Sequence, residues 1–187
     1  MNEAIIEAIE RYTPWNEQEE RDQSFLLKQL REQENIFTRD NEAMHMTAAA
    51  WVVNPEKTKA LMAYHNIFDS WSWLGGHADG DSDLLRVAIK EVREESGVQL
   101  VKPISDEIFS LEVLTVDGHV KKGKYVSSHL HLNVTYLLEA SEADVLSIKE
   151  DENSGVAWFT LEEAVKASSE PWFREQIYAK LNAKMKM

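Results

Sequence analysis

The stretch GGHADGDSDLLRVAIKEVREESGV, residues 75–98, joins a glycine pair and an acidic loop to an amphipathic segment that ends in a glycine. Its apolar spacing predicts a helix from Asp83 to Ser96. Gly97 follows as the residue past the C-terminus, because glycine readily takes the left-handed backbone that ends a helix. We therefore expect a glycine-rich loop that leads into a helix, and the side chains of that helix bear on what the protein does.

The predicted helix carries three carboxylates, Glu91, Glu94 and Glu95, on one face, because residues three and four apart are neighbours. The other side carries four apolar residues that would pack on a sheet: Leu85, Ala88, Ile89 and Val92. Like charges at this spacing repel by roughly 0.2–0.5 kcal/mol, and the helix dipole disfavours anions at this end by ~0.3–1 kcal/mol. A bound divalent cation would relieve both costs, and a solvated charged face is the alternative.

Composition narrows the class of protein. The chain has 187 residues, of which 33 are acidic and 20 basic, and its formal charge is -13. This charge opposes binding to a nucleic acid polymer, which needs clustered Lys and Arg, but it does not oppose a site for a divalent metal. Because there are no cysteines, the sequence excludes a disulfide framework, a zinc–thiolate site and a cysteine nucleophile.

The N-terminus gives no sign of a membrane or an export route. The segment MNEAIIEAIERY has acidic residues inside its apolar pattern, whereas the apolar core of a secretory signal is uncharged. No apolar run approaches the length needed to span a bilayer. We expect a cytoplasmic protein with no membrane partner.

The rest of the chain predicts both strands and helices. Residues 1 to about 36 have helical periodicity interrupted at Pro14, and Asn16 with Glu19 matches a capping box. Further on, the sequence predicts a hairpin of MHMTAAAWVVNP and TKALMAYHNIF, strands in IFSLEVLTVDG, KYVSSHLHLNVTYLLEA and SGVAWFT, and closing helices in LEEAVKA and PWFREQIYAKLNAK. This order of elements predicts an α/β (α+β) fold with a mixed β-sheet covered on both faces.

Residues 76–98 resemble the box of the Nudix (MutT-like) hydrolase family, which reads Gly, five residues, Glu, seven residues, Arg-Glu-apolar-x-Glu-Glu-x-Gly-apolar. The positions that fall in register are Gly76, Glu91, Val92, Glu94, Glu95, Gly97 and Val98. The preceding hairpin and the later SGVAWFTLEEA also resemble the strands and closing helix of that fold. The resemblance covers about residues 43–168, so it is far more specific than a lone glycine motif.

The resemblance implies a domain organisation. Residues 43–187 would form the Nudix hydrolase domain, an α/β/α sandwich with a mixed β-sheet, and residues 1–40 an N-terminal helical extension. The extension carries apolar residues at Phe25, Leu26, Leu27 and Leu30. It could pack on the main domain, act as a lid or supply the contact of a homodimer, and the sequence leaves these roles open.

Two positions depart from the family pattern. The first Glu of the box is Ser82 here, and its Arg is Lys90. In the family these two side chains are expected to pair and hold the loop on the helix, so the rigidity of the loop is in doubt. Asp83, seven residues before Lys90, and Asp81 in the loop are candidates for a looser substitute for that pair.

Members of this family hydrolyse a nucleoside diphosphate linked to another moiety, so the resemblance implies a pyrophosphohydrolase acting on a small-molecule diphosphate. By the same resemblance Glu91, Glu94 and Glu95 would bind Mg²⁺ or Mn²⁺, and the Gly76 carbonyl would be a further ligand. Metal ions neutralise the diphosphate and lower the pKa of the attacking water. The general base would be Glu152, in the loop KEDENSGVAWF, with Glu94 as its rival, and a surface turn residue is the alternative reading of Glu152.

Substrate contacts are expected elsewhere. His129 and His131 share one side of a predicted strand, and His77 follows the glycine pair, so each is a candidate for binding the substrate. Ordinary polar positions are the alternative. The basic run VKKGK at residues 120–124 could attract an anion or be a solvated hairpin tip. Trp71, Trp73 and Phe68 could stack on a base, although packing is the better expectation for each.

Two other functions remain. A ligand-sensing domain on the same fold is supported by the altered Ser82 and Lys90 but opposed by the intact carboxylates. Isopentenyl-diphosphate isomerases share this fold, but their protonation chemistry uses a cysteine, which this chain lacks.

Overall fold

The computed structural model of the chain describes residues 2–121 and 123–186, which divide into two compact units. The first consists of Met1–Ala49, Gly76–Val87 and Asp106–Tyr136, and the second of Ala50–Gly75, Ala88–Ser105 and Leu137–Met187. Four elements contribute residues to both units: β1 (Met44–Val53), β4 (Leu74–His77), α3 (Leu84–Ser96) and β9 (His129–Ala140). The division therefore does not follow the order of the chain.

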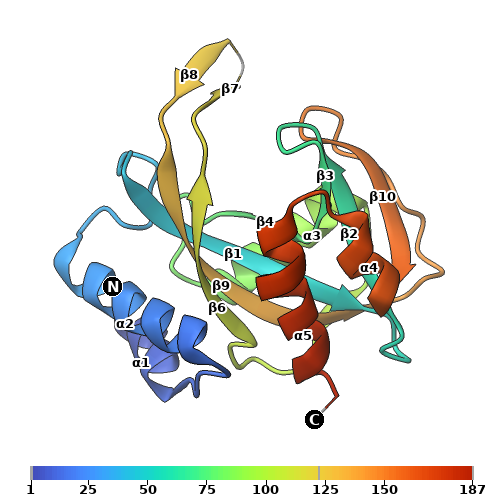
Figure 1. Cartoon of the computed structure of the whole chain (residues 1–187), viewed down its shortest axis with the longest axis horizontal. Helices are drawn as coiled ribbons and strands as arrows, with labels where there is room; N and C mark the ends of the chain where they lie inside the picture. The colour runs from blue at the N-terminus through green and yellow to red at the C-terminus, as the bar shows by residue number, and fades with distance from the viewer. Residues whose placement is uncertain (1, 122, 187) are drawn as a thin grey trace. The chain divides into compact units, whose positions relative to one another are not determined.

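In the first unit, helix α1 (Glu3–Arg11) packs on α2 (Glu17–Glu32), and α2 packs on strand β6 (Ser110–Val116) (Figure 1). Strand β6 pairs antiparallel with β9, which also pairs with β1. Contacts between β1 and β9 advance together along both segments, from Ala43 with Leu130 to Thr47 with Asn133, as in a parallel pair. Strands β7 (His119–Lys121) and β8 (Lys124–Val126) form a separate hairpin.

In the second unit, β2 (Lys59–His65) pairs antiparallel with β10 (Asn153–Thr160), with β3 (Ser70–Ser72) and with the end of β1. Strand β5 (Val101–Pro103) pairs with the end of β9. Helix α4 (Leu161–Ala167) packs on β2 and β10, and the chain closes with a π-helical segment η1 (Phe173–Tyr178) and α5 (Ala179–Lys184) (Figure 1). The stacked rings of Trp51 and Tyr178, with centroids 5.4 Å apart, lie in the core of this unit.

Helix α3 ends as the sequence predicts, with Gly97 at φ +77°. Its buried stripe differs from the prediction. Ala88 and Val92 are buried as expected, but Leu84 and Val87 are buried where Leu85 and Ile89 were predicted, because Leu85 and Ile89 are only half-buried. The stripe, spaced three and four residues apart, continues through Glu91 and Glu95, so two of the carboxylates lie inside it.

The predicted fold class is confirmed. The chain is an α+β protein whose sheet mixes parallel and antiparallel pairs, and the N-terminal helices are present. The hairpin expected around Pro55–Lys57 is confirmed by the pairing of Val52 with Leu61. Asn16 caps α2 by accepting a hydrogen bond from the Glu19 backbone. Among the helices described, none is both long and apolar enough to cross a membrane.

Candidate functional site

The carboxylates of α3 differ in their exposure. Glu95 is 1% exposed and Glu91 is 7% exposed, whereas the Glu94 side chain is 42% exposed. Burying a carboxylate is costly unless cations or hydrogen bonds compensate it. The second unit, which contains all three residues, therefore has to supply such partners.

Glu95 is held from two sides. Its Oε2 atom accepts a hydrogen bond from the Gly75 N–H at 2.9 Å, and its Oε1 atom lies 3.5 Å from Nε2 of His65. The Asn153 amide donates to the Glu95 backbone carbonyl at 3.0 Å, which ties the start of β10 to the helix. Burial raises the pKa of Glu95 to about 8, and the nearby Glu91 carboxylate adds to this effect. The first loop glycine thus orients a buried acid.

Two lysines lie among the carboxylates. Lys90 Nζ is 3.0 Å from Glu91 Oε1 and 3.5 Å from Glu94 Oε1. Lys149 Nζ is 3.5 Å from Glu94 Oε2 and 3.0 Å from Glu152 Oε2. Burial opposes the charge of Lys149, but its carboxylate neighbours, Glu152 foremost, raise its pKa to about 12. These ammonium groups provide positive charge at the carboxylate cluster.

Glu152, the predicted general base, belongs to the same group of side chains. It lies one residue before β10, and its side chain is 27% exposed. Its backbone carbonyl accepts a hydrogen bond from the Asn66 N–H at 3.1 Å, so the loop that carries it is tied to the end of β2. The structure therefore links Glu152 through Lys149 to Glu94, the rival candidate. Sequence reasoning did not single out Lys149 or His65, although Lys149 begins the quoted loop KEDENSGVAWF.

The structure gives contacts for Lys90 and for the two acids proposed as substitutes for the family's pair. Lys90 contacts the carboxylates of its own helix, as described above. Asp81 and Asp83, the candidates for a substitute pair, both contact Arg86. Its Nη2 atom is 2.6 Å from Asp81 Oδ1, and its Nη1 atom is 3.3 Å from Asp83 Oδ2. Asp83 also caps the first turn, since its Oδ1 accepts from the Arg86 N–H at 3.0 Å. Asp81 and Asp83 thus form ion pairs with Arg86 at the start of α3.

The predicted substrate-binding histidines lie together in the first unit. His131 Nε2 is 3.1 Å from His129 Nε2, and the His77 and His131 rings are 4.9 Å apart. His45, at the start of β1, lies among them with ring centroids 5.1 Å from His77 and 4.9 Å from His129. The sequence analysis missed His45. A count of histidines on the predicted strands would have drawn attention to it.

The other candidates have ordinary surroundings. Trp73 is 7% exposed and packs against Phe173 and Tyr178, and Trp71 packs edge-on to Tyr64, so both serve packing. Phe68 is 44% exposed, 6.0 Å from the His65 ring. The basic run at residues 120–124 is the tip of the β7–β8 hairpin, with Lys122 outside the described residues.

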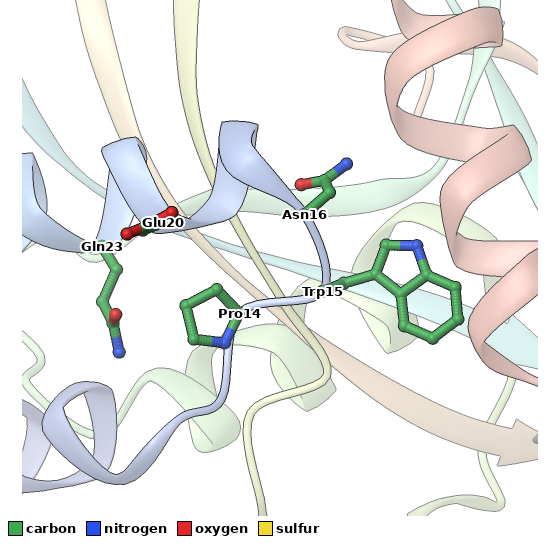
Figure 2. A pocket seen from close by; sticks show the side chains of 5 residues that line it. All are labelled: Pro14, Trp15, Asn16, Glu20 and Gln23. Atoms are coloured by element: carbon green, nitrogen blue, oxygen red, sulfur yellow. The ribbon is translucent and has the colours of Figure 1, made fainter.

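A pocket lies at the turn between α1 and α2. Figure 2 shows its lining of Pro14, Trp15, Asn16, Glu20 and Gln23. No residue that the sequence singles out for metal or substrate binding is among them.

The donor type of α3, carboxylate oxygen, suits a divalent cation, although within the described part of the chain these carboxylates are not among the groups whose donor atoms lie within 4.8 Å of one another. Oxygen ligands suit Mg²⁺ and Mn²⁺, and the structure supplies carboxylates that are buried at one end of a helix and compensated by cationic side chains. Such an arrangement can bind a cation while its exposed member, Glu94, faces solvent. A further carboxylate, Glu152, contacts the same lysine as Glu94, Lys149. This is a suitable arrangement for hydrolysis of an anionic substrate.

Comparison with known proteins agrees with this chemistry. The model of the NUDIX domain family matches residues 44–181. Among curated proteins, none matches the sequence. Among solved structures, the chain resembles an Ap4A hydrolase of C. elegans in a binary complex, with 19% identity, a TM-score of 0.54, and coverage of 75% of this chain and 94% of the other.

Two further structures show the same fold. A NUDIX-family hydrolase from Clostridium perfringens shares 19% identity with a TM-score of 0.52, covering 76% of this chain and 96% of its own. The MutT protein from Methanosarcina mazei Go1 shares 14% identity with a TM-score of 0.57, covering 79% of this chain and 99% of its own. The family model spans most of the chain and includes the box at residues 76–98 with its carboxylate helix. The chain therefore belongs to the NUDIX domain family.

Proposed function

We propose that the protein cleaves the diphosphate bond of a small substrate in which a nucleoside diphosphate is linked to another group, using Mg²⁺ or Mn²⁺. The observation that carries the proposal is the pair of buried carboxylates, Glu91 and Glu95, beside the exposed Glu94 on α3. A bound divalent cation would supply neutralisation of the diphosphate and a lower pKa for the attacking water.

The three glutamates would hold that cation, and each has a structural reason for its position. The Gly75 N–H fixes the Glu95 carboxylate, and Lys90 contacts both Glu91 and Glu94. The carbonyl of Gly76, the next residue after Gly75, stays a predicted further ligand. The family resemblance supports these assignments, together with the oxygen-rich donor set.

We assign the proton-accepting role to Glu152, with Glu94 as the alternative. Lys149 lies between the two carboxylates and orients both. A general base needs hydrogen-bond reach of the attacking water, and a half-buried carboxylate on a loop tied at Asn66 can keep such a position. His77, His129 and His131 stay predicted substrate contacts, either through an imidazole or through a cation that they bind.

A ligand-sensing role on the same fold is the second candidate. The observation that favours it is the contact of Lys90 and Lys149 with the carboxylates, since two ammonium groups already supply cationic charge to the acidic face. The Ser82 and Lys90 departures point the same way. In that case the chain would bind a diphosphate compound without turning it over.

The test is a panel of diphosphates assayed with Mg²⁺ or Mn²⁺, with the products identified by mass. The panel spans nucleotide sugars, dinucleotides, nucleoside triphosphates and isopentenyl diphosphate. We expect one class to be cleaved, a chelator to stop the reaction, and Glu95→Gln to lower kcat/KM by roughly 100-fold or more.

The matched control is Glu162→Gln on α4, which removes an exposed carboxylate that pairs only with Lys166 among its described contacts. It should keep the wild-type rate. Absence of turnover by the wild type, with a thermal shift on adding a panel compound, would favour the sensing role. A Glu95→Gln variant as fast as the wild type would refute the assigned metal site.

A further inference from the structure

We propose that His45, His77 and His131 form a second metal site, one that takes a borderline transition-metal ion of the Zn²⁺ class through three imidazole nitrogens. Each ring offers one nitrogen, and these three nitrogens lie within 4.8 Å of one another. Among the described residues, this is the group of histidines and acids whose donor atoms converge in this way. It differs in donor type from the carboxylates of α3.

The three ligands come from three strands of the first unit. His45 is the second residue of β1, His77 is the last of β4, and His131 lies near the start of β9. The His45 ring is 5.1 Å from both other rings, and the His77 and His131 rings are 4.9 Å apart. Ligands placed on strands hold a cation more precisely than ligands placed on loops.

His45 provides the strongest argument. It is 4% exposed, and its Nδ1 atom is 3.0 Å from the Asn41 carbonyl, so Nδ1 carries the proton and donates. Its Nε2 atom is then a bare acceptor, which is buried and has no hydrogen-bond partner among the described residues. A buried polar atom of this kind is costly and calls for a ligand. A metal-binding histidine has this arrangement, with one nitrogen donating to a carbonyl and the other on the metal.

His129 is a positioning residue for His131. The His129 Nδ1 atom is 2.8 Å from the Ser127 carbonyl, so it donates there and leaves Nε2 as an acceptor. The facing Nε2 atom of His131, 3.1 Å away, then has to be the donor. This contact orients the His131 ring and leaves its other nitrogen deprotonated, as metal binding requires.

The donor type selects the class of metal. Neutral imidazole is the ligand form for Zn²⁺, Co²⁺, Ni²⁺ and Cu²⁺, whereas Mg²⁺ prefers oxygen.

The geometry suits a tetrahedral ion with one open position. Zinc–nitrogen distances of about 2.0–2.1 Å place tetrahedral ligand nitrogens roughly 3.4 Å apart. Because the three histidine nitrogens here lie within 4.8 Å of one another, they have to move slightly closer together to bind the ion. Three histidines leave the fourth position for water or for an oxygen of a substrate. His77 and His131, which are predicted to contact the substrate, would then do so through the bound cation.

The experiment measures metal binding by the full chain. Chelator-treated protein is saturated with Mg²⁺ and then titrated with Zn²⁺ or Co²⁺, with bound metal counted by equilibrium dialysis and elemental analysis. We expect one ion per chain, with a Co²⁺ absorption spectrum typical of nitrogen ligands in tetrahedral geometry. His77→Gln and His131→Gln should each weaken this binding at least about tenfold.

Two control variants and one variant of the positioning residue make the result specific. His119→Gln removes a nearby histidine whose ring is 6.4 Å from that of His129 and which is outside the ligand set. It should bind metal as the wild type does, and so should Glu94→Gln on α3. His129→Gln should weaken binding about 10-fold or more while the tetrahedral Co²⁺ spectrum persists, because it positions a ligand without being one.

Circular dichroism of each variant shows whether it is folded. Equal binding by the His77 and His131 variants and the wild type would overturn the proposal. So would a loss of the ion in Glu94→Gln, which would place it at the carboxylates.

Discussion

A single buried acid, Glu19, connects the N-terminal turn to the sheet of the first unit. It is fully buried, and its Oε2 atom accepts hydrogen bonds from the Tyr12 hydroxyl at 2.5 Å and the Trp15 N–H at 2.7 Å. Its Oε1 atom accepts from the Ser110 hydroxyl at 2.7 Å. The Ser110 hydroxyl, which has one proton for both contacts, also hydrogen-bonds with Glu112, another fully buried acid. The family pattern contains none of these residues, so this network belongs to the architecture and not to the catalytic box.

We predict that Glu19→Ala destabilises the protein by roughly 2–4 kcal/mol, because it removes the acceptor of three hydrogen bonds, from the Trp15 N–H and from the Tyr12 and Ser110 hydroxyls. Denaturant unfolding followed by circular dichroism measures this change. Glu20→Ala, at the exposed neighbouring position, is the control and should cost about 0.5 kcal/mol or less. Equal stability of the two variants would show that the network contributes little.

The assignment of the general base is also a question about single residues. We predict that Glu152→Gln lowers kcat by about 10²–10⁴-fold while Mg²⁺ affinity stays near the wild-type value, because a general base contributes that much and is not a metal ligand. Glu94→Gln should weaken metal binding as well. Steady-state kinetics at several Mg²⁺ concentrations separate the two effects.

Glu150→Gln is the control for this pair, since it alters an exposed acid in the same loop. It should leave both parameters unchanged. If Glu152→Gln retains a kcat within about twofold of the wild type, the base is Glu94 or another group.

At the scale of elements, the end of α3 shows how a backbone requirement and a packing requirement coincide. Gly97 has φ +77°, and a Cβ atom there would lie 2.2 Å from Ser147 Oγ and 3.0 Å from the Ser147 nitrogen. The Ser147 N–H in turn donates to the Ser96 carbonyl at 2.8 Å, which satisfies a backbone acceptor at the end of the helix. The glycine thus lets a later loop approach the carboxylate helix closely.

We predict that Gly97→Ala destabilises the protein more than Gly80→Ala does. Both glycines have positive φ, which costs a residue with a Cβ roughly 1–2 kcal/mol, but the Cβ at Gly80 would meet no atom within 4 Å. The difference between the two variants in denaturant unfolding therefore isolates the clash with Ser147. Equal losses would mean that the loop moves aside at no cost.

Periodicity in the sequence predicted the strands but not which of their polar residues are buried. Strict alternation predicted β9, and the strand runs over His129–Ala140. On the side of this strand that carries His129 and His131, Asn133 and Thr135 are buried and donate hydrogen bonds to Glu112 at 2.9 and 2.8 Å. Alternation reports which residues share a side, but the partner that buries that side comes from a distant part of the chain.

At the scale of the whole molecule, the N-terminal helices lie outside the family match, which covers residues 44–181. Helix α2 nevertheless packs on strand β6, and α1 packs on α2. Gln18 donates to the Leu111 carbonyl at 3.0 Å, and Asp22 accepts from the Val113 N–H at 2.9 Å, so α2 satisfies backbone groups along β6. Among the roles that the sequence left open, this contact favours packing.

We predict that removing residues 1–40 lowers the thermal stability of the remaining chain and promotes its aggregation. The deletion exposes backbone groups of β6 and the apolar surface that covers Leu26 and Leu30, and an uncovered strand edge pairs readily with other chains. Thermal unfolding and light scattering of the full and shortened chains measure this. An equally stable shortened chain would show that residues 43–187 fold without the extension.

Local patterns were enough to recognise the family box. The spacing of Gly76, Glu91, Glu94, Glu95 and Gly97 is contained in 23 consecutive residues, and a helix places such neighbours on one face whatever the rest of the chain does. The same holds for the strands and the hairpin, because alternation and turn residues act over short distances.

Tertiary structure decided which of these groups are buried and which meet. Lys149 lies 55 residues after Glu94 in the chain, and His45, His77 and His131 are on three separate strands, so no local pattern brings them together. Their contacts depend on strand order and register, which are set by the burial of apolar surface over the whole sheet. The box could therefore be recognised from the sequence, whereas the lysine contacts and the histidine cluster could be seen only in the fold.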